Sequence, residues 1–104
     1  MKKEQEEVAQ FMEKHDLGGT TAFRLLDLVS EVGEVAKDAT KTSEYGQKEE
    51  DLDVKKDEIG DVLFSLLAVS NDLDIDAEEA FEEAMEKYED RISDGGDPGS
   101  GSHS

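Results

Sequence analysis

The feature that most constrains the fold is a helical spacing of apolar residues, which recurs in four segments of the chain. In each segment, apolar side chains follow one another at steps of three and four residues, and this places them on one face of a helix. The expected helices cover residues 2–16, 20–41, 54–71 and 77–92. No segment alternates apolar and polar residues for long enough to predict a sheet. The sequence therefore predicts an all-α fold.

Polar residues mark where these helices begin. Thr20 or Thr21 can cap the second helix, because a threonine hydroxyl accepts a hydrogen bond from a free backbone N–H of the first turn. Asp76, followed three residues later by Glu79, has the form of a capping box for the fourth helix. Between the second and third helices, residues 42–53 are polar and show no periodicity, so we expect a loop.

A chain of 104 residues has room for one domain, which we place at residues 1–92. The remaining residues, 93–104, are rich in glycine and serine and contain the one proline, which predicts a disordered tail. The third helix is nearly all apolar in its second half and should be deeply buried there. Because so small a chain has difficulty covering wide apolar faces, we expect a four-helix bundle that completes its core by homo-oligomerisation.

The charge balance excludes several classes of protein. With 29 acidic and 11 basic residues, the net charge is −18, and such a surface repels the phosphates of a nucleic acid polymer. The longest mostly apolar run, residues 62–71, is about half the length of a membrane-spanning helix, and no signal sequence is evident. We therefore expect a soluble, cytoplasmic protein without a membrane or nucleic acid partner. Such acidity is also typical of proteins from salt-loving organisms, which makes a halophilic source a further expectation.

Acidic residues border the apolar faces of the two central helices. The second helix carries four of them within about 60° of one another, at Asp27, Glu31, Glu34 and Asp38. The third helix carries Glu58 and Asp61, which are neighbours one turn apart. Antiparallel packing of the two helices would bring four of these acids towards a common point, namely Glu31, Glu34, Glu58 and Asp61.

Four carboxylates at one point would repel one another by about 1 to 4 kcal/mol per close pair. Either protonation or a divalent cation would offset this repulsion, and without metal some of the carboxyl pKa values should be raised. The chain has no cysteine, so a metal would be bound by oxygen or by its two histidines, which favours a hard cation such as Mg²⁺. The alternative is that so acidic a chain places acids one turn apart by chance on solvated faces.

Two stretches of the chain, LLDLVSEVGEVAKDA and KKDEIGDVLFSLLAVSNDLDIDAEEAFEEAMEKYEDRI, resemble the MazG-like family of all-α nucleoside triphosphate pyrophosphohydrolases. The resemblance covers residues 25–92. The family signature, Glu-x-x-Glu on one helix and Glu-x-x-Asp on the next, is matched by Glu31, Glu34, Glu58 and Asp61.

This resemblance implies a Mg²⁺-dependent enzyme, with Mn²⁺ as an alternative metal, that cleaves a nucleoside triphosphate between its α and β phosphorus atoms. The products would be the monophosphate and pyrophosphate, in a reaction that serves the upkeep of the nucleotide pool. The four acids would be the catalytic metal ligands, unless one of the glutamates instead takes the proton of the attacking water. The resemblance also implies a homodimer or homotetramer with sites near the subunit contacts.

Many relatives approach the substrate through a lysine and an asparagine of the last helix, and this chain has Ala84 and Tyr88 at those two places. The resemblance therefore does not by itself identify the residues that bind substrate here. A further glutamate of many relatives is replaced here by Ser30. The candidates that remain for binding substrate are one asparagine and three cations, namely Asn71, Lys37, Lys87 and Arg91. The alternative roles are a helix cap for the asparagine and solvated surface charges for the cations.

Two other functions stay open. The first is a noncatalytic, homo-oligomeric helical module that binds nucleotides or a partner helix. The second is a phosphoribosyl-ATP pyrophosphohydrolase, although such enzymes usually carry a histidine where this chain has Ser65.

Overall fold

Four helices and one short 3₁₀ turn make up the computed structural model, which describes residues 1–95. They are α1 (Lys2–Lys14), α2 (Thr21–Thr42), η1 (Glu49–Asp51), α3 (Lys56–Asp72) and α4 (Ala77–Ser93). Within residues 1–95 there is no strand, so the prediction of an all-α fold is confirmed. No helix in this part of the chain combines the length and the apolar character needed to cross a membrane.

The helices begin where the sequence predicts caps. The hydroxyl of Thr20 accepts a hydrogen bond from the Phe23 N–H at 3.2 Å, and the Asp76 carboxylate accepts from the N–H groups of Glu78 and Glu79 at 2.9 and 3.2 Å. The start of α3 differs from the prediction by two residues. In the structure the Asp53 N–H donates to the Thr42 hydroxyl at 2.8 Å, and this bond holds the chain just before α3 to the end of α2.

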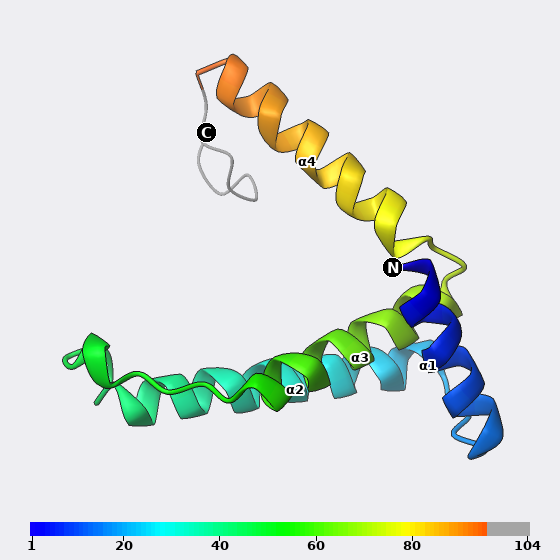
Figure 1. Ribbon diagram of the computed structural model, residues 1–104, viewed down its shortest axis with the longest axis horizontal. Coiled ribbons are helices and arrows are strands. Elements are labelled where there is room, and N and C mark those ends of the chain that lie inside the picture. Colours follow the sequence, from blue (N-terminus) through cyan, green and yellow to red (C-terminus); the bar gives the residue numbers. More distant parts are fainter. Residues whose placement is uncertain (96–104) are drawn as a thin grey trace.

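The centre of the molecule is an antiparallel hairpin of α2 and α3, which lie side by side (Figure 1). At one end, the guanidinium of Arg24 on α2 forms an ion pair with the carboxylate of Asp72 on α3. At the other end, Thr42 meets Asp53, as described above. These contacts confirm the expected antiparallel packing of the two acid-bearing helices.

The buried core lies where α1 crosses the end of this hairpin. Val8 of α1 packs there with Leu67 and Ala68 of α3, and Met12 lies against this cluster. Residues 67–70 of α3 are buried, as the apolar composition of this half of the helix predicts, but Phe64 and Leu66 in the same half stay exposed, at 37% and 44%.

The four helices do not close into a bundle within one chain. In Figure 1, α4 projects away from the hairpin, and α1 is the helix on which it mainly packs. Apolar faces that were expected to be buried are exposed, with exposed fractions of 56% for Ile59, 63% for Phe81 and 56% for Ile92. The radius of gyration is 16.6 Å, compared with about 13 Å for a compact domain of this length. A single chain therefore leaves these faces uncovered, which agrees with the expectation that so small a chain has difficulty covering them.

The end of α4 lies close to the predicted domain boundary. The helix continues to Ser93, one residue into the expected tail. The rest of that tail, residues 96–104, lies outside the part of the chain that the structure describes.

Candidate functional site

The hairpin carries all four residues of the two acidic motifs. Glu31 and Glu34 project from α2, and Glu58 and Asp61 project from α3. Glu31 and Glu58 are half-buried, whereas Glu34 and Asp61 are exposed. The two half-buried acids lie towards the contact between the helices, and the two exposed acids lie at its edge.

The register of the hairpin sets how these acids are spaced. Asp38 of α2 lies beside Glu58 of α3. Glu34 lies one turn before Asp38 on α2, and Asp61 lies one turn after Glu58 on α3. Because the two helices run in opposite directions, Glu34 and Asp61 lie at the same level of the hairpin. Glu31 lies one further turn along the same side of α2. The four acids of the motifs therefore occupy about two turns of the hairpin, on one side of it.

Glu58 has the most unusual environment among these acids. One of its carboxyl oxygens, Oε2, is shielded from solvent and has no hydrogen-bond partner. The pKa of Glu58 is raised from its ordinary value of 4.5 to about 7, first by a hydrogen bond to the Asp38 carboxyl, then by partial loss of water, and then by the charge of Asp38. Because the ionised form of Glu58 would lie against another carboxyl group, this contact favours the protonated form of Glu58 in the metal-free protein.

The raised pKa of Glu58 has its cause in a contact with one other carboxyl group, while crowding among the four acids of the motifs stays a prediction. The partner, Asp38, is not one of the four acids in the two motifs. It lies seven residues after Glu31, which is two turns along the helix and about 20° around it. The acidic stripe of the sequence already contained this residue, but the spacing alone gave no reason to place it next to Glu58.

The donor atoms on this side of the hairpin have the chemistry that a hard cation needs. A shielded oxygen without a donor and two carboxyl groups in contact would both be stabilised by a positive charge bound between them. Oxygen ligands of this kind suit Mg²⁺. The site is not preassembled, because within residues 1–95 no three acidic or histidine side chains converge closely enough to hold a metal.

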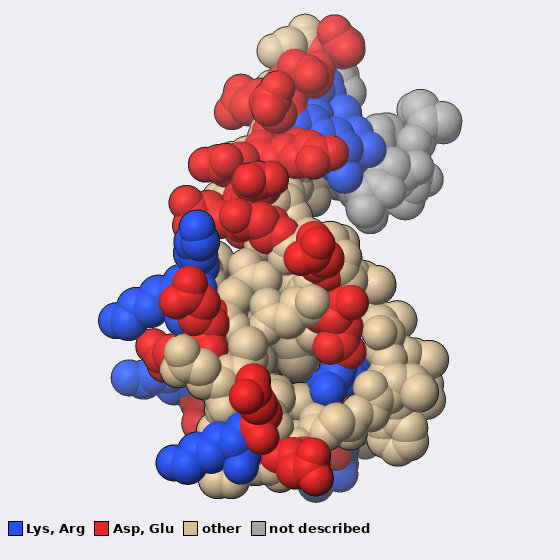
Figure 2. All heavy atoms as spheres, turned by 90° about the vertical axis from the view of Figure 1, so that its right-hand side faces the viewer, with Lys and Arg blue, Asp and Glu red and all other residues tan. Residues whose placement is uncertain are grey.

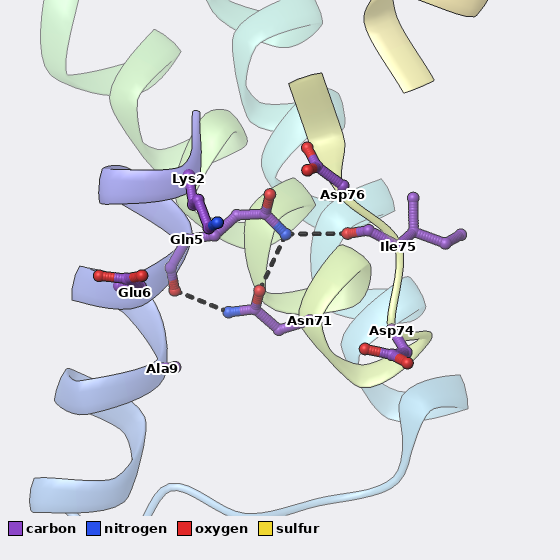
Figure 3. Close-up of a pocket in the computed structure, with 8 residues that line it drawn as sticks. All are labelled: Lys2, Gln5, Glu6, Ala9, Asn71, Asp74, Ile75 and Asp76. Atoms are coloured by element: carbon purple, nitrogen blue, oxygen red, sulfur yellow. Dashed lines mark hydrogen bonds between the residues drawn. The ribbon is translucent and has the colours of Figure 1, made fainter. Parts of the chain in front are cut away.

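Asn71 has a structural role in the described chain. Its amide donates to the backbone oxygen of Gln5 at 2.9 Å and accepts from the Gln5 side chain at 2.9 Å, as Figure 3 shows. Both ends of the Asn71 amide are thus used to connect α3 with α1. Leu73 is the cap residue of α3, so the alternative reading of Asn71 as the helix cap is wrong.

The cations proposed for substrate binding are spread over two helices. Lys37 is exposed on α2, the helix that carries Glu31 and Glu34. Lys87 and Arg91 are on α4, which projects away from the hairpin, and the Lys87 amine lies 5.5 Å from the ring centre of Tyr88. The single chain therefore brings Lys37 to the acidic helices but leaves α4 and its two cations apart from them.

Comparisons with known proteins agree with this helical arrangement. The model of the MazG nucleotide pyrophosphohydrolase domain matches residues 20–95. YpjD of Bacillus subtilis (strain 168), described as uncharacterized, is 41% identical over 71 residues, which are 64% of this chain and 62% of YpjD. The chain thus aligns with less than two thirds of the length of that relative.

A solved structure extends the similarity to three dimensions. The crystal structure of YPJD from Bacillus subtilis, described as that of a candidate pyrophosphatase, matches with a TM-score of 0.66 and 34% identity, covering 81% of this chain and 86% of that chain. The matched domain takes in α2, α3 and α4 and all four acids of the two motifs. The chain therefore belongs to the family of MazG nucleotide pyrophosphohydrolase domains.

Proposed function

We propose that the protein is a Mg²⁺-dependent nucleoside triphosphate pyrophosphohydrolase, which releases pyrophosphate and the nucleoside monophosphate. The observation that carries this proposal is the crowded, partly desolvated carboxyl pair of Glu58 and Asp38, within the hairpin that bears both acidic motifs. Membership of the MazG family supports the reaction type. The side of the hairpin that carries the acids is the proposed reaction site.

In this proposal, Glu31, Glu34, Glu58 and Asp61 hold Mg²⁺, or Mn²⁺ as an alternative. When bound, such a metal polarises the phosphoryl group and lowers the pKa of a bound water molecule. In the metal-free protein, Glu58 can hold or release a proton near neutral pH, because its pKa is raised to about 7. Asp38 acts through Glu58, as a positioning residue that keeps this carboxyl protonated until a metal takes the place of the proton.

Each residue proposed to bind substrate needs a different arrangement of the chain to reach the site. Lys37 can reach phosphate from α2, the helix that bears the first acidic motif. Lys87 and Arg91 reach a site only if α4 meets the hairpin of a neighbouring subunit. A contact from Asn71 requires its amide to leave Gln5, to which it is bonded at both ends.

We also propose that the protein is a homodimer or homotetramer. The chain exposes 7940 Å² of surface, whereas a compact monomer of 11.5 kDa exposes about 5,800 Å². Even if residues 96–104 had the full surface of an unfolded segment, about 1,100 Å², an excess of about 1,000 Å² would remain. A stable interface buries about 800 Å² from each partner, so the excess is large enough for self-association.

The proposed activity is tested by measuring pyrophosphate release from a panel of ordinary and modified nucleoside triphosphates, with phosphoribosyl-ATP included. The assay is run with Mg²⁺, at low and at molar KCl. We expect release from at least one nucleotide, and loss of this release in Glu34→Gln and in Asp61→Asn. The matched control is Glu86→Gln, which removes one charge from the exposed side of α4 and should leave the activity unchanged.

Thermal melting separates the hydrolase from a noncatalytic binding module. A Mg²⁺-dependent rise in melting temperature without release from any substrate would favour the binding module. Release that is unaffected by Glu34→Gln and Asp61→Asn, with circular dichroism showing intact helices, would contradict the proposed site.

A further inference from the structure

Met12 of α1 lies where α1 crosses the hairpin, with its sulfur against the guanidinium of Arg24. The Arg24 Nη1 nitrogen donates to the Met12 sulfur at 3.9 Å. Met12 is partly buried and packs against the core cluster described above. A thioether sulfur is only a weak hydrogen-bond acceptor. This contact therefore gives a cationic donor a weak partner inside the fold.

The guanidinium of Arg24 is held in place by its other nitrogens. Its Nε forms the ion pair with the carboxylate of Asp72 on α3, and its Nη2 donates to the backbone oxygen of Leu17 at 3.0 Å. The side chain of Arg24 is only 15% exposed, so little water is available to replace the sulfur as a partner of Nη1. Arg24 thus cannot turn away from Met12 without breaking bonds to two other segments.

Two cavities meet at this contact, and both Met12 and Arg24 line each of them. The first has a volume of about 50 Å³ and extends to Asp27 and Ser65 on the hairpin. The second has a volume of about 190 Å³ and lies between α1 and the end of α3. Because a water-sized molecule needs about 10–15 Å³, each cavity has room for hydrogen peroxide and for one further oxygen atom on the sulfur.

Oxidation of the sulfur would place an oxygen where Arg24 can bind it. A sulfoxide oxygen lies about 1.5 Å from its sulfur, and a donor that approaches it meets the S–O direction at roughly 120°. Since Nη1 is 3.9 Å from the sulfur, an oxygen on the near side lies about 2.9 Å from this nitrogen. This is the ordinary length of an N–H···O hydrogen bond, to an acceptor that is more polar than a thioether.

We propose that Met12 is a site of oxidation by peroxide, and that Arg24 binds the sulfoxide oxygen and so strengthens the junction of α1 with the hairpin. In this reaction a lone pair of the sulfur forms the S–O bond while the O–O bond of the peroxide breaks. The departing oxygen takes the proton of the transferred oxygen and leaves as water, so the sulfur loses two electrons and the peroxide gains them. Arg24 donates to the departing oxygen as negative charge develops on it. The inference does not depend on the proposed hydrolysis of nucleotides.

The surface charge favours a neutral oxidant. Figure 2 faces the end of the molecule where α1 lies, and acidic side chains cover much of α4 and border the uncharged surface below it. With a net charge of −18, the molecule repels anionic oxidants. Hydrogen peroxide is uncharged and approaches without this repulsion.

The chain contains its own control, because its three methionines are Met1, Met12 and Met85. Met85 is 42% exposed on α4, away from this junction. The folded protein is treated with a limiting amount of hydrogen peroxide and then digested. The peptides are incubated with two methionine sulfoxide reductases, each of which reduces one epimer of the sulfoxide. Mass spectrometry then gives the proportion of each epimer at Met12 and at Met85.

We expect one epimer at Met12 in about fivefold excess or more, because only one of the two sulfur lone pairs faces Arg24. The two epimers should form in comparable amounts at Met85, and at both positions when the protein is oxidised in urea. Equal amounts of the two epimers at Met12 of the folded protein would overturn the proposal.

Thermal melting tests whether Arg24 binds the new oxygen. Oxidation should raise the melting temperature of the unmodified protein by about 4–8 °C relative to Met12→Leu, which corrects for oxidation of Met1 and Met85. In Arg24→Lys, one nitrogen cannot serve both Asp72 and Met12, so oxidation should lower the melting temperature.

An unchanged or lower melting temperature of the oxidised unmodified protein, relative to Met12→Leu, would overturn the proposal, as would an equal rise in Arg24→Lys. Circular dichroism shows whether the two variants retain their helices. The epimer ratio is measured on the unmodified protein, so it decides the question even if Arg24→Lys does not fold. Neither measurement involves nucleotides, so a failure of the proposed reaction is seen separately.

Discussion

At the scale of single residues, the contact between Asp38 and Glu58 links the proposed chemistry to pH. The pKa of Glu58 lies near 7 in the folded protein and near 4.5 ordinarily. Between these values, the folded metal-free protein holds more protons than the unfolded chain. The contribution of Glu58 to stability is therefore present below pH 4.5 and is lost as the pH rises through 7.

Replacing Asp38 tests the cause of this raised pKa. In Asp38→Asn, the neighbouring charge is removed and an amide donor can bond to the ionised Glu58. We expect the pKa of Glu58 to fall from about 7 towards 4.5, measured by carbon NMR of the labelled glutamate carboxyls without metal. Asp27→Asn, on the same helix, is the control. An unchanged titration midpoint in Asp38→Asn would show that Asp38 is not the cause.

Metal binding should expel the proton that Glu58 holds in the metal-free protein. Titration of the protein with Mg²⁺ near pH 7, in two buffers of different ionisation enthalpy, should give different apparent heats because a proton is released. The affinity for Mg²⁺ should fall as the pH decreases from about 7 towards 4.5, as Glu58 becomes protonated. Identical heats in the two buffers would contradict proton release.

At the scale of helices, the sequence predicted where each helix lies and how two of them begin. The hydroxyl of Thr20 and the carboxylate of Asp76 cap α2 and α4 because capping depends on residues close in the chain. Contacts between segments that are distant in the chain could not be predicted in this way. The bonds of Gln5 to Asn71 and Ile75, and the pairing of Asp38 with Glu58, depend on how the helices are placed in three dimensions.

The same limit explains why the sequence could not say what covers the apolar faces. Periodicity shows which face of a helix is apolar, but it does not show what covers that face. Phe81 and Ile59 therefore fit a buried pattern in the sequence and are exposed in the chain. The acidic motifs themselves could be found from spacing and resemblance, while their convergence on a metal remains a prediction.

Gln5 is expected to be important for stability. In Gln5→Ala, the Ala77 N–H and the side-chain oxygen of Asn71 lose their partners on α1, and leaving such groups unsatisfied costs about 1–3 kcal/mol where they are buried. The free energy of unfolding, measured with urea, should fall by about this amount. Gln10→Ala, at an exposed position of the same helix, should change it little. Equal effects of the two substitutions would show that the bonds of Gln5 do not stabilise the fold.

At the scale of the whole molecule, a net charge of −18 opposes both folding and self-association. Salt screens this repulsion, since the screening length falls from about 10 Å at 0.1 M to about 3 Å at 1 M. We expect the melting temperature and the fraction of dimer to rise as KCl increases over this range. Sucrose at equal osmolality is the control for effects unrelated to charge, and a response to sucrose as large as that to KCl would argue against screening.

Acids and apolar residues lie on opposite sides of the hairpin, because Val32 and Glu34 on α2, and likewise Ile59 and Asp61 on α3, point about 160° apart. Substitutions on the apolar side can therefore tighten or loosen an assembly while Glu34 and Asp61 keep their surroundings. Substrate contacts that come from α4 of a neighbouring copy would instead change together with the assembly. A descendant protein could thus alter the way its subunits meet, and its nucleotide preference with it, while it keeps the same metal ligands.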